Sequence, residues 1–401
     1  MSETQLWARS GAMTLTGRPD GPALLGTGSP ANALRAALDR LVAAGVPDVP
    51  GVELLGERAA LTGARRNAPW SVGGAFRILP ASDGWFGVSL SRPDDLALLP
   101  ALIEDSTPLD HPDTDPWTTL GRWLRRTPAS EAGNRARMLG LPAADVPAHP
   151  RPPRRPPVVN LPGGRRPLTE RPVVVDFSVL WAGPLCAHLL GLAGAQVIKV
   201  ESRFRPDGAR RGSPEFFDLL HGGHRSVVLD FAADRAALHA LVARADVVLE
   251  SSRPRALAHL GLDAAREVAR GAIWASISAG GRDDAMRAGF GDDIAAGAGL
   301  VAWESGVPYP MGDALGDPLT GVTAAAEVVE ALQRNHGALI DVSMHDVCAD
   351  AAIRPRTGGH AVKPRPPRAR TVRRSAARNG ADTASVLREL TRRETAQARN
   401  A

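Results

Sequence analysis

Residues 173–201 read VVVDFSVLWAGPLCAHLLGLAGAQVIKVE, and this stretch decides the fold class. The apolar run 173–177 predicts a buried strand, a helix is expected over 184–193, and 197–201 predicts a second buried strand. Two apolar strands joined by a helix are typical of a parallel β-α-β unit, because parallel strands need a crossover connection.

The same alternation continues along the chain. Further apolar strands are expected over 225–230, 246–250, 273–277 and 339–342, with a helix over 233–244. This pattern favours an α/β fold with a Rossmann-like parallel sheet covered on both faces. In such sheets ligands bind beyond the carboxyl ends of the strands. The first five strands end in polar or small residues: Asp176, Glu201, Asp230, Glu250 and residues 276–278.

The turn after the first strand lacks the Gly-x-Gly-x-x-Gly pattern of dinucleotide-binding proteins and reads Trp181-Ala182-Gly183-Pro184. A nicotinamide or flavin dinucleotide is therefore not expected. The sequence also has no Walker loop, no Cys/His metal spacing and no Gly-x-Ser-x-Gly elbow. We expect no metal and no permanently bound cofactor.

Composition limits the class of protein. Hydrophobic residues make up 44% of the chain, enough for a sizeable core. Two cysteines, Cys186 and Cys348, are too few for a disulfide framework or a zinc site, which favours a reducing cytoplasm. The sequence shows no apolar run of transmembrane length and no signal peptide, so no membrane association is expected.

Much of the excess of basic residues lies in two segments. The formal net charge is +5, and many arginines lie in 151–171 and 361–378, where no aromatic residues are interleaved to stack on bases. Nucleic-acid binding, which would show a steep salt dependence, is the least favoured function.

Four segments are expected. Residues 1–145 predict a helix over 33–44 with Asn32 as its N-cap, a hairpin with strands over 74–80 and 84–90, and helices over 93–103 and 117–126. Residues 146–171 carry too much proline for a helix or a central strand, so they predict an extended connector. Residues 172–347 form the Rossmann-like domain, and 348–401 form a basic C-terminal segment.

One carboxylate stands out in the stretch GDALGDPLTG, residues 312–321, which precedes a helical run to residue 332. Asp317 lies between Gly316 and Pro318, which is a conventional helix start with an acidic cap. The alternative is a reactive carboxylate held at a loop–helix junction, where glycines let a substrate approach closely.

Seven motifs together resemble the family III CoA-transferases, the CaiB/BaiF group, which includes formyl-CoA transferase and the α-methylacyl-CoA racemases. They follow the family's order over about 173–347. They are DFSVLWAGPLC (176–186), GAQVIKVE (194–201), HRSVVLD (224–230), ADVVLE (245–250), GFGDDI (289–294), ALGDPLTG (314–321) and GALIDVSM (337–344).

The resemblance implies that Asp317 is the nucleophile of an acyl-CoA:carboxylate CoA-transferase. The matching aspartate attacks the thioester of an acyl-CoA and carries the acyl group as a mixed anhydride. Released CoA then forms an aspartyl-CoA thioester, from which CoA passes to a carboxylic acid acceptor. CoA is thus a substrate, and an interlocked homodimer is implied. Asp313 is a second acid in the loop, outside the matched position.

The family resemblance also indicates which residues contact the substrate and CoA. Several of these positions depart from the family's usual residues, which leaves a non-catalytic CoA-binding protein as an alternative. Arg203, Arg253 and His259 are candidates for contacts with the CoA phosphates. The full set is Trp181, Ala182, Arg203, His224, Ser251, Ser252, Arg253, His259, Gly316 and Gly321.

An acyl-CoA racemase or isomerase of the same fold is the runner-up. Racemases of the family place a histidine before Asp-Ile, whereas this chain has Asp292 before Asp293-Ile294 and so lacks one acid–base group.

The N-terminal part has resemblances of its own. Residues 7–17 resemble the segment before the family's catalytic loop, and 83–88 resemble the hairpin of its small domain. Residues 1–145 therefore look like a partial family half without its aspartate, and 380–390 resemble the family's closing helix.

Overall fold

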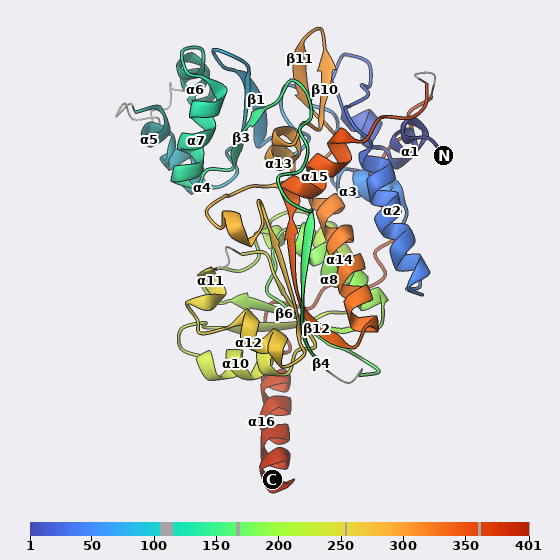
Figure 1. Cartoon of the computed structure of the whole chain (residues 1–401), viewed down its shortest axis with the longest axis vertical. Coiled ribbons are helices and arrows are strands. Elements are labelled where there is room, and N and C mark those ends of the chain that lie inside the picture. Colours follow the sequence, from blue (N-terminus) through green and yellow to red (C-terminus); the bar gives the residue numbers. More distant parts are fainter. Residues whose placement is uncertain (105–114, 166–168, 253–254, 360–361, 401) are drawn as a thin grey trace.

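A seven-stranded sheet forms the centre of the protein in a computed structural model, which describes all residues except 105–114, 166–168, 253–254, 360–361 and 401 (Figure 1). The strand order is β4-β12-β9-β8-β5-β6-β7. The strands are β4 (Val158–Arg165), β5 (Val173–Asp176), β6 (Gln196–Ser202), β7 (Arg225–Leu229), β8 (Val247–Glu250), β9 (Ile273–Ser278) and β12 (His336–Ser343).

The six strands that the sequence predicts are all present, and they pair in parallel. Their order is that of a doubly wound Rossmann sheet, in which the direction of winding reverses beside the first strand. Here the reversal lies between β5 and β8. The predicted α/β fold class is therefore confirmed, and the crevice at this reversal is the expected place for a ligand.

Helices cover both faces of the sheet because successive strand residues point to opposite sides. In β5, Val174 belongs to the core on one face and Val175 to the core on the other. The first face is covered by α8 (Ala182–Leu192) and α14 (Gly316–Gln333). The second face is covered by α10 (Arg235–Ala243), α12 (Ala264–Ala269) and the start of α16 (Thr383–Asn400).

The proline-rich connector is not merely an extended link. Its residues Val158–Arg165 form β4, which pairs antiparallel with β12 at the edge of the sheet. An edge strand needs a ladder partner on one side only, so it tolerates Pro162, which lies opposite Ala338. Proline excluded a central strand correctly, but it did not exclude an edge strand.

The predicted hairpin is confirmed in a small α+β unit. Strands β1 (Phe76–Pro80) and β2 (Trp85–Ser89) pair antiparallel, and β3 (Ala143–Val146), which the sequence analysis did not predict, pairs with β2. Helices pack on this sheet around Phe86, Leu99 and Leu124. They are α4 (Pro93–Ala97), α5 (Leu99–Ile103), α6 (Pro116–Leu124) and α7 (Ala129–Leu139).

The first 62 residues, which we call the N-terminal segment, lie apart from that unit (Figure 1). They contain α1 (Glu3–Ser10), α2 (Pro30–Ala43) and α3 (Glu57–Thr62), and α2 packs against α14. Helix α2 is the helix expected over 33–44, but its N-cap is Ser29 and not Asn32, because Pro30 begins the first turn.

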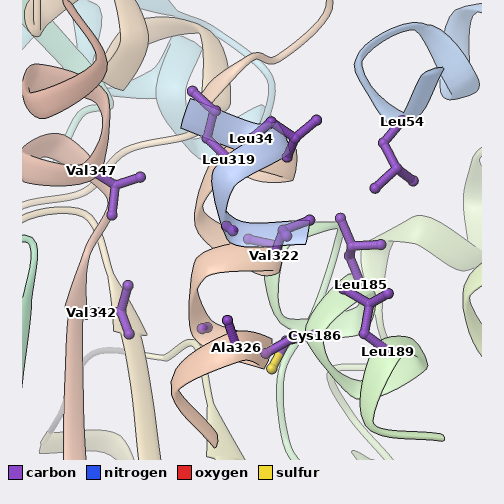
Figure 2. Packing of buried hydrophobic residues seen from close by; sticks show 14 of the residues in the cluster. Leu34, Leu54, Leu185, Cys186, Leu189, Leu319, Val322, Ala326, Val342 and Val347 are labelled. Atoms are coloured by element: carbon purple, nitrogen blue, oxygen red, sulfur yellow. The ribbon is translucent and has the colours of Figure 1, made fainter. Parts of the chain in front are cut away.

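The N-terminal segment shares the largest core of the protein with α8 and α14. Figure 2 shows side chains from all three parts in this core: Leu34, Leu54, Leu185, Leu189, Leu319 and Val322. Residues 1–145 are thus divided between this core and the small unit. The four-segment division of the chain stays a prediction.

The remaining elements complete the body. They are the hairpin β10 (Val301–Glu304) and β11 (Val307–Pro310), α9 (Pro214–His221), α11 (Arg255–Ala258), α13 (Gly291–Gly297) and α15 (Met344–Ile353). Helix α16 begins where the closing helix was expected, packs on β7 and extends away from the body (Figure 1). Among the described residues, no helix combines the length and apolar character that crossing a membrane requires.

Candidate active site

Asp317 lies in the first turn of α14. The sequence suggested that it caps this helix from outside, with Pro318 as the first helical residue. That prediction is wrong: α14 begins at Gly316 and its N-cap is Leu315. The Asp317 backbone N–H donates to the Ala314 carbonyl (2.9 Å).

The Asp317 carboxylate meets the beginnings of two other helices. The backbone N–H groups of Ala182, the first residue of α8, and Gly291, the first residue of α13, lie near the carboxylate and lower its pKa. The first N–H groups of a helix have no partner within it, and they carry the positive end of its dipole. These backbone donors therefore favour negative charge on the Asp317 oxygens.

Glycines make this close approach possible. A Cβ on Gly291 would overlap both Asp317 Oδ2 and the Ala314 carbonyl oxygen, and a Cβ on Gly316 would lie 3.0 Å from the Gly291 carbonyl oxygen. Gly291 was not among the site residues predicted from the sequence, although it lies in the quoted motif GFGDDI. Its position before Asp292 was the signal that could have identified it.

A cation joins the site from the N-terminal segment. Arg58 of α3 donates from Nε to Asp313 Oδ2 (3.0 Å) and from Nη2 to Asp313 Oδ1. Its guanidinium also lies 4.6 Å from the centroid of the Trp181 ring, a cation–π contact. Sequence reasoning missed Arg58 entirely.

Asp292 is a third acid at the site. Its Oδ1 accepts from the Ala314 N–H (3.0 Å), which ties α13 to the loop before α14. Asp292, Asp313 and Asp317 thus surround Arg58 electrostatically, and all three raise the pKa of Arg58 against the lowering effect of its burial.

The surroundings raise the pKa values of two of these acids toward neutral pH. Burial raises the pKa of Asp317 to about 7; Arg58 and the two backbone donors lower it, whereas Asp292 raises it further. Burial, followed by the Asp313 charge, raises the pKa of Asp292 to about 6. A carboxylate with a raised pKa is more basic than an ordinary one, and such shifts are typical of groups that act in catalysis.

The turn between β5 and α8 is held in an uncommon conformation. Leu180 has φ = 70°, and Ala314, in the loop before α14, has φ = 44°. Residues other than glycine in this region are strained by about 1–3 kcal/mol and concentrate at functional sites. The Leu180 N–H donates to Asp207 Oδ1 (3.0 Å), and the Val179 N–H donates to Ser251 Oγ (3.0 Å).

The structure brings together several of the predicted site residues. Trp181 and Ala182 begin α8 beside Asp317, and Ser251 follows β8 on the other side of the sheet's reversal. Gly316 is buried at the same junction. Gly321 has a packing role, because a Cβ there would lie 2.5 Å from the Ala182 carbonyl oxygen.

The other predicted CoA contacts lie elsewhere. His224 is buried, and burial together with Lys199 lowers its pKa to about 3, so it is neutral at pH 7 and offers no cation. Arg203 and His259 are exposed, and Arg253 lies outside the described residues. Their contacts with CoA, like that of Ser252, stay predictions.

In the described part of the chain, no three His, Cys, Asp or Glu side chains are grouped so that they could hold a metal ion. The carboxylates instead face Arg58 and backbone donors.

Asp293 carries a buried carboxyl group beside the site. Its Oδ1 accepts from Ser89 Oγ (2.9 Å) and from the Phe290 N–H (3.0 Å), and burial raises its pKa to about 7. Because this value is above the usual 3.8, the group favours folding at low pH. Its stabilising effect is lost as the pH rises from about 4 through 7.

We therefore expect Asp293→Asn to stabilise the protein at high pH. The amide keeps both accepted hydrogen bonds and removes the buried charge, so the gain in unfolding free energy should be on the order of 2 kcal/mol greater at pH 8 than at pH 4.5. Urea unfolding at the two pH values measures it.

Asp346→Asn is the matched control with the opposite sign. Burial alone would raise the pKa of Asp346, but the nearby His345 ring and hydrogen bonds from Ser343 Oγ and the Arg154 N–H lower it to about 2. Its loss should reduce stability at pH 8. A gain for Asp293→Asn that is independent of pH would contradict the argument.

Comparison with known proteins places this site in context. The family model for CoA-transferase family III matches residues 172–380, just over half of the chain. The formyl-CoA:oxalate CoA-transferase of Rhodopseudomonas palustris (strain TIE-1) is 30% identical over 192 residues, which cover 43% of this chain and 45% of that protein. The succinyl-CoA:mesaconate CoA-transferase of Haloarcula hispanica is 30% identical over 200 residues, covering 43% and 50%.

A solved structure is also similar in part. A CAIB/BAIF family protein from Brucella suis aligns with a TM-score of 0.43 and 28% sequence identity, covering 49% of this chain and 61% of that chain. The chain spans about half the length of the curated relatives it matches.

Proposed function

The chain belongs to CoA-transferase family III, and we propose that it transfers CoA from an acyl-CoA donor to a carboxylic acid acceptor through covalent intermediates on Asp317. The observation that carries this proposal is the position of Asp317, a carboxylate of raised pKa beside the first N–H groups of α8 and α13. CoA acts as a substrate in this proposal and not as a resident cofactor.

In the first half of the reaction, an Asp317 oxygen attacks the thioester carbonyl, the C–S bond breaks, and CoA leaves as its thiolate. The product is a mixed anhydride between Asp317 and the acyl group. The thiolate then attacks the Asp317 carbonyl carbon, which releases the donor's carboxylate and leaves an aspartyl-CoA thioester.

The second half repeats these steps in reverse with the acceptor. Its carboxylate attacks the aspartyl thioester, releases the CoA thiolate and forms a second mixed anhydride. The thiolate attacks the acceptor's acyl carbon, which yields the new acyl-CoA and restores the Asp317 carboxylate. Covalent carriage divides one difficult exchange into easier steps.

The Ala182 and Gly291 N–H groups support each step in which Asp317 itself is attacked. Negative charge then develops on an Asp317 oxygen, and donors already placed at that oxygen stabilise it without reorganisation. The proposed oxyanion donors thus lie beside the nucleophile's own carboxyl group, at the starts of two helices.

We further propose that the protein works as a homodimer in a reducing cytoplasm. The family resemblance supports the dimer, and the two cysteines are free and buried, as in proteins that do not rely on disulfides. Light scattering of the purified protein measures the oligomeric state, and a mass of one chain would contradict the dimer.

Covalent trapping tests the proposed function. The protein is incubated with a panel of acyl-CoAs, quenched with hydroxylamine and digested, and peptide mass spectrometry then locates any hydroxamate. We expect it on Asp317 in the wild-type protein and not in Asp317→Asn.

The other outcomes separate the alternatives. A hydroxamate on Asp292 or Asp313 would move the nucleophile to that residue. Absence of any adduct, combined with exchange of the substrate's α-proton for solvent deuterium, would identify a racemase. CoA binding with neither reaction would identify a non-catalytic protein, and absence of CoA binding would overturn the proposal.

A further inference from the structure

The N-terminal segment forms one wall of the Asp317 site. Thr16 Oγ1 accepts a hydrogen bond from the Gly312 N–H (3.0 Å), and the Trp7 ring lies where a Cβ on Gly312 would be only 3.3 Å away. These contacts hold the start of the loop that leads to Asp317. Residues about 300 positions apart in the sequence therefore contact each other directly at the site.

Arg58 is fixed in this wall by contacts on two sides. Asp313 receives two parallel hydrogen bonds from its guanidinium, and the Trp181 ring lies against the guanidinium plane. Its side chain is 29% exposed, whereas that of Asp313 is 2% exposed. A planar guanidinium group held by both contacts has little freedom to turn away from the site.

The groups that face Asp317 are mostly acidic or neutral. They are Asp292 from α13, Cys348 from α15 and Arg58 from α3. Burial raises the pKa of the Cys348 thiol, which therefore stays neutral. Of these groups, which all belong to the described residues, Arg58 is the one that carries a positive charge.

We propose that Arg58 is a positioning residue that favours the ionised form of Asp317, so that the N-terminal segment supplies the positive charge of the active site. This inference rests on the proposed function of Asp317. Nearby like charges disfavour ionisation of a carboxyl group, and an opposite charge favours it. Without Arg58, Asp317 would face Asp292 with no compensating cation.

The N-terminal segment therefore contributes to the Asp317 site through Thr16, Trp7 and Arg58.

The test is a direct titration of Asp317 in the full-length protein without substrate. The protein is labelled with ¹³C-aspartate, and infrared difference spectra against Asp317→Asn isolate the Asp317 carboxylate band. We expect Arg58→Gln to raise the titration midpoint by at least about one pH unit, which reduces the ionised fraction at pH 6 about tenfold. Arg58→Lys, which keeps the charge, should stay near the wild-type midpoint.

Further variants separate charge from structure. Arg58→Gln leaves Asp313 buried without its partner. The double variant Arg58→Gln/Asp313→Asn therefore provides a second test, in which neither charge is present. We expect the Asp317 titration midpoint to shift upward in this variant as well. Asp292→Asn should shift the midpoint downward, because Asp292 raises the pKa of Asp317.

Arg210→Gln is the matched control. Arg210 also forms a two-pronged ion pair, with Glu201, and its guanidinium lies 4.5 Å from the Phe217 ring centroid. It is not among the groups that shift Asp317. Its loss should leave the Asp317 midpoint unchanged.

An Asp317 midpoint that stays at the wild-type value in Arg58→Gln and in the double variant would overturn the inference. Acyl-adduct formation is measured separately. An upward shift without any adduct would support the role of Arg58 and reject the transfer mechanism. An adduct on Asp317 without the shift would support the transfer mechanism and reject the role of Arg58.

Discussion

Asp317→Asn should reduce CoA transfer by at least about 10³-fold, because an amide cannot form the mixed anhydride on which both halves of the reaction depend. Asparagine has nearly the same shape, and its remaining carbonyl oxygen can accept from the Ala182 or Gly291 N–H. The loss should therefore appear in kcat with the fold intact. Steady-state transfer between an acyl-CoA and a free acid measures it.

Stability provides an independent check on this variant. Burial raises the pKa of Asp317 from 3.8 to about 7, so the stability that this group contributes is lost as the pH rises from about 4 through 7. Asp317→Asn should then be at least as stable as the wild-type protein at pH 8, a combination of lost activity and kept stability that is typical of a functional site. An inactive variant that is also unfolded would not fit this account.

Asp313→Asn is the comparison within the same loop. Asp313 pairs with Arg58 through two hydrogen bonds, whereas the Ala182 and Gly291 N–H groups act on Asp317. Its replacement should reduce the rate much less than Asp317→Asn. A larger loss for Asp313→Asn would place the nucleophile at Asp313.

The sheet was predictable because its strands are buried on both faces. Strands of that kind appear as short, nearly continuous apolar runs, as in 173–177 and 246–250. The edge strand β4 lacks this signal, since it is half-exposed and contains Pro162. The sequence therefore predicted the parallel part of the sheet and missed its antiparallel edge.

The candidate site was predictable only where one local motif carried it. Asp317, Gly316 and Gly321 belong to a single loop and helix, and Trp181 and Ala182 to a single turn. The contact between Arg58 and Asp313 joins residues 255 positions apart. Periodicity and turn signals describe local structure, so they could not assign Arg58 to the site.

Gly291→Ala should give the second largest loss, about 10²-fold in the rate of acylation. Gly291 does not adopt a left-handed conformation, so alanine fits its backbone, and the effect arises from space alone. The new Cβ would overlap Asp317 Oδ2 and the Ala314 carbonyl oxygen, and one of these groups must move. A displacement of about 1 Å at a reacting group costs roughly this factor.

The variant should also lose about 1–3 kcal/mol of unfolding free energy, because the α13–α14 junction has no room for an added methyl group. Gly121→Ala is the matched control: Gly121 lies in helix α6, and a Cβ there would meet nothing within 4 Å. It should keep the wild-type rate and gain about 0.5–1 kcal/mol, since alanine is the better helix former. Rapid-quench experiments measure the acylation rate, and urea unfolding measures the stability.

A wild-type rate of acylation in Gly291→Ala would contradict this argument. It would mean that Asp317 does not need its close approach to the start of α13, and the oxyanion role of the Gly291 N–H would have to be abandoned.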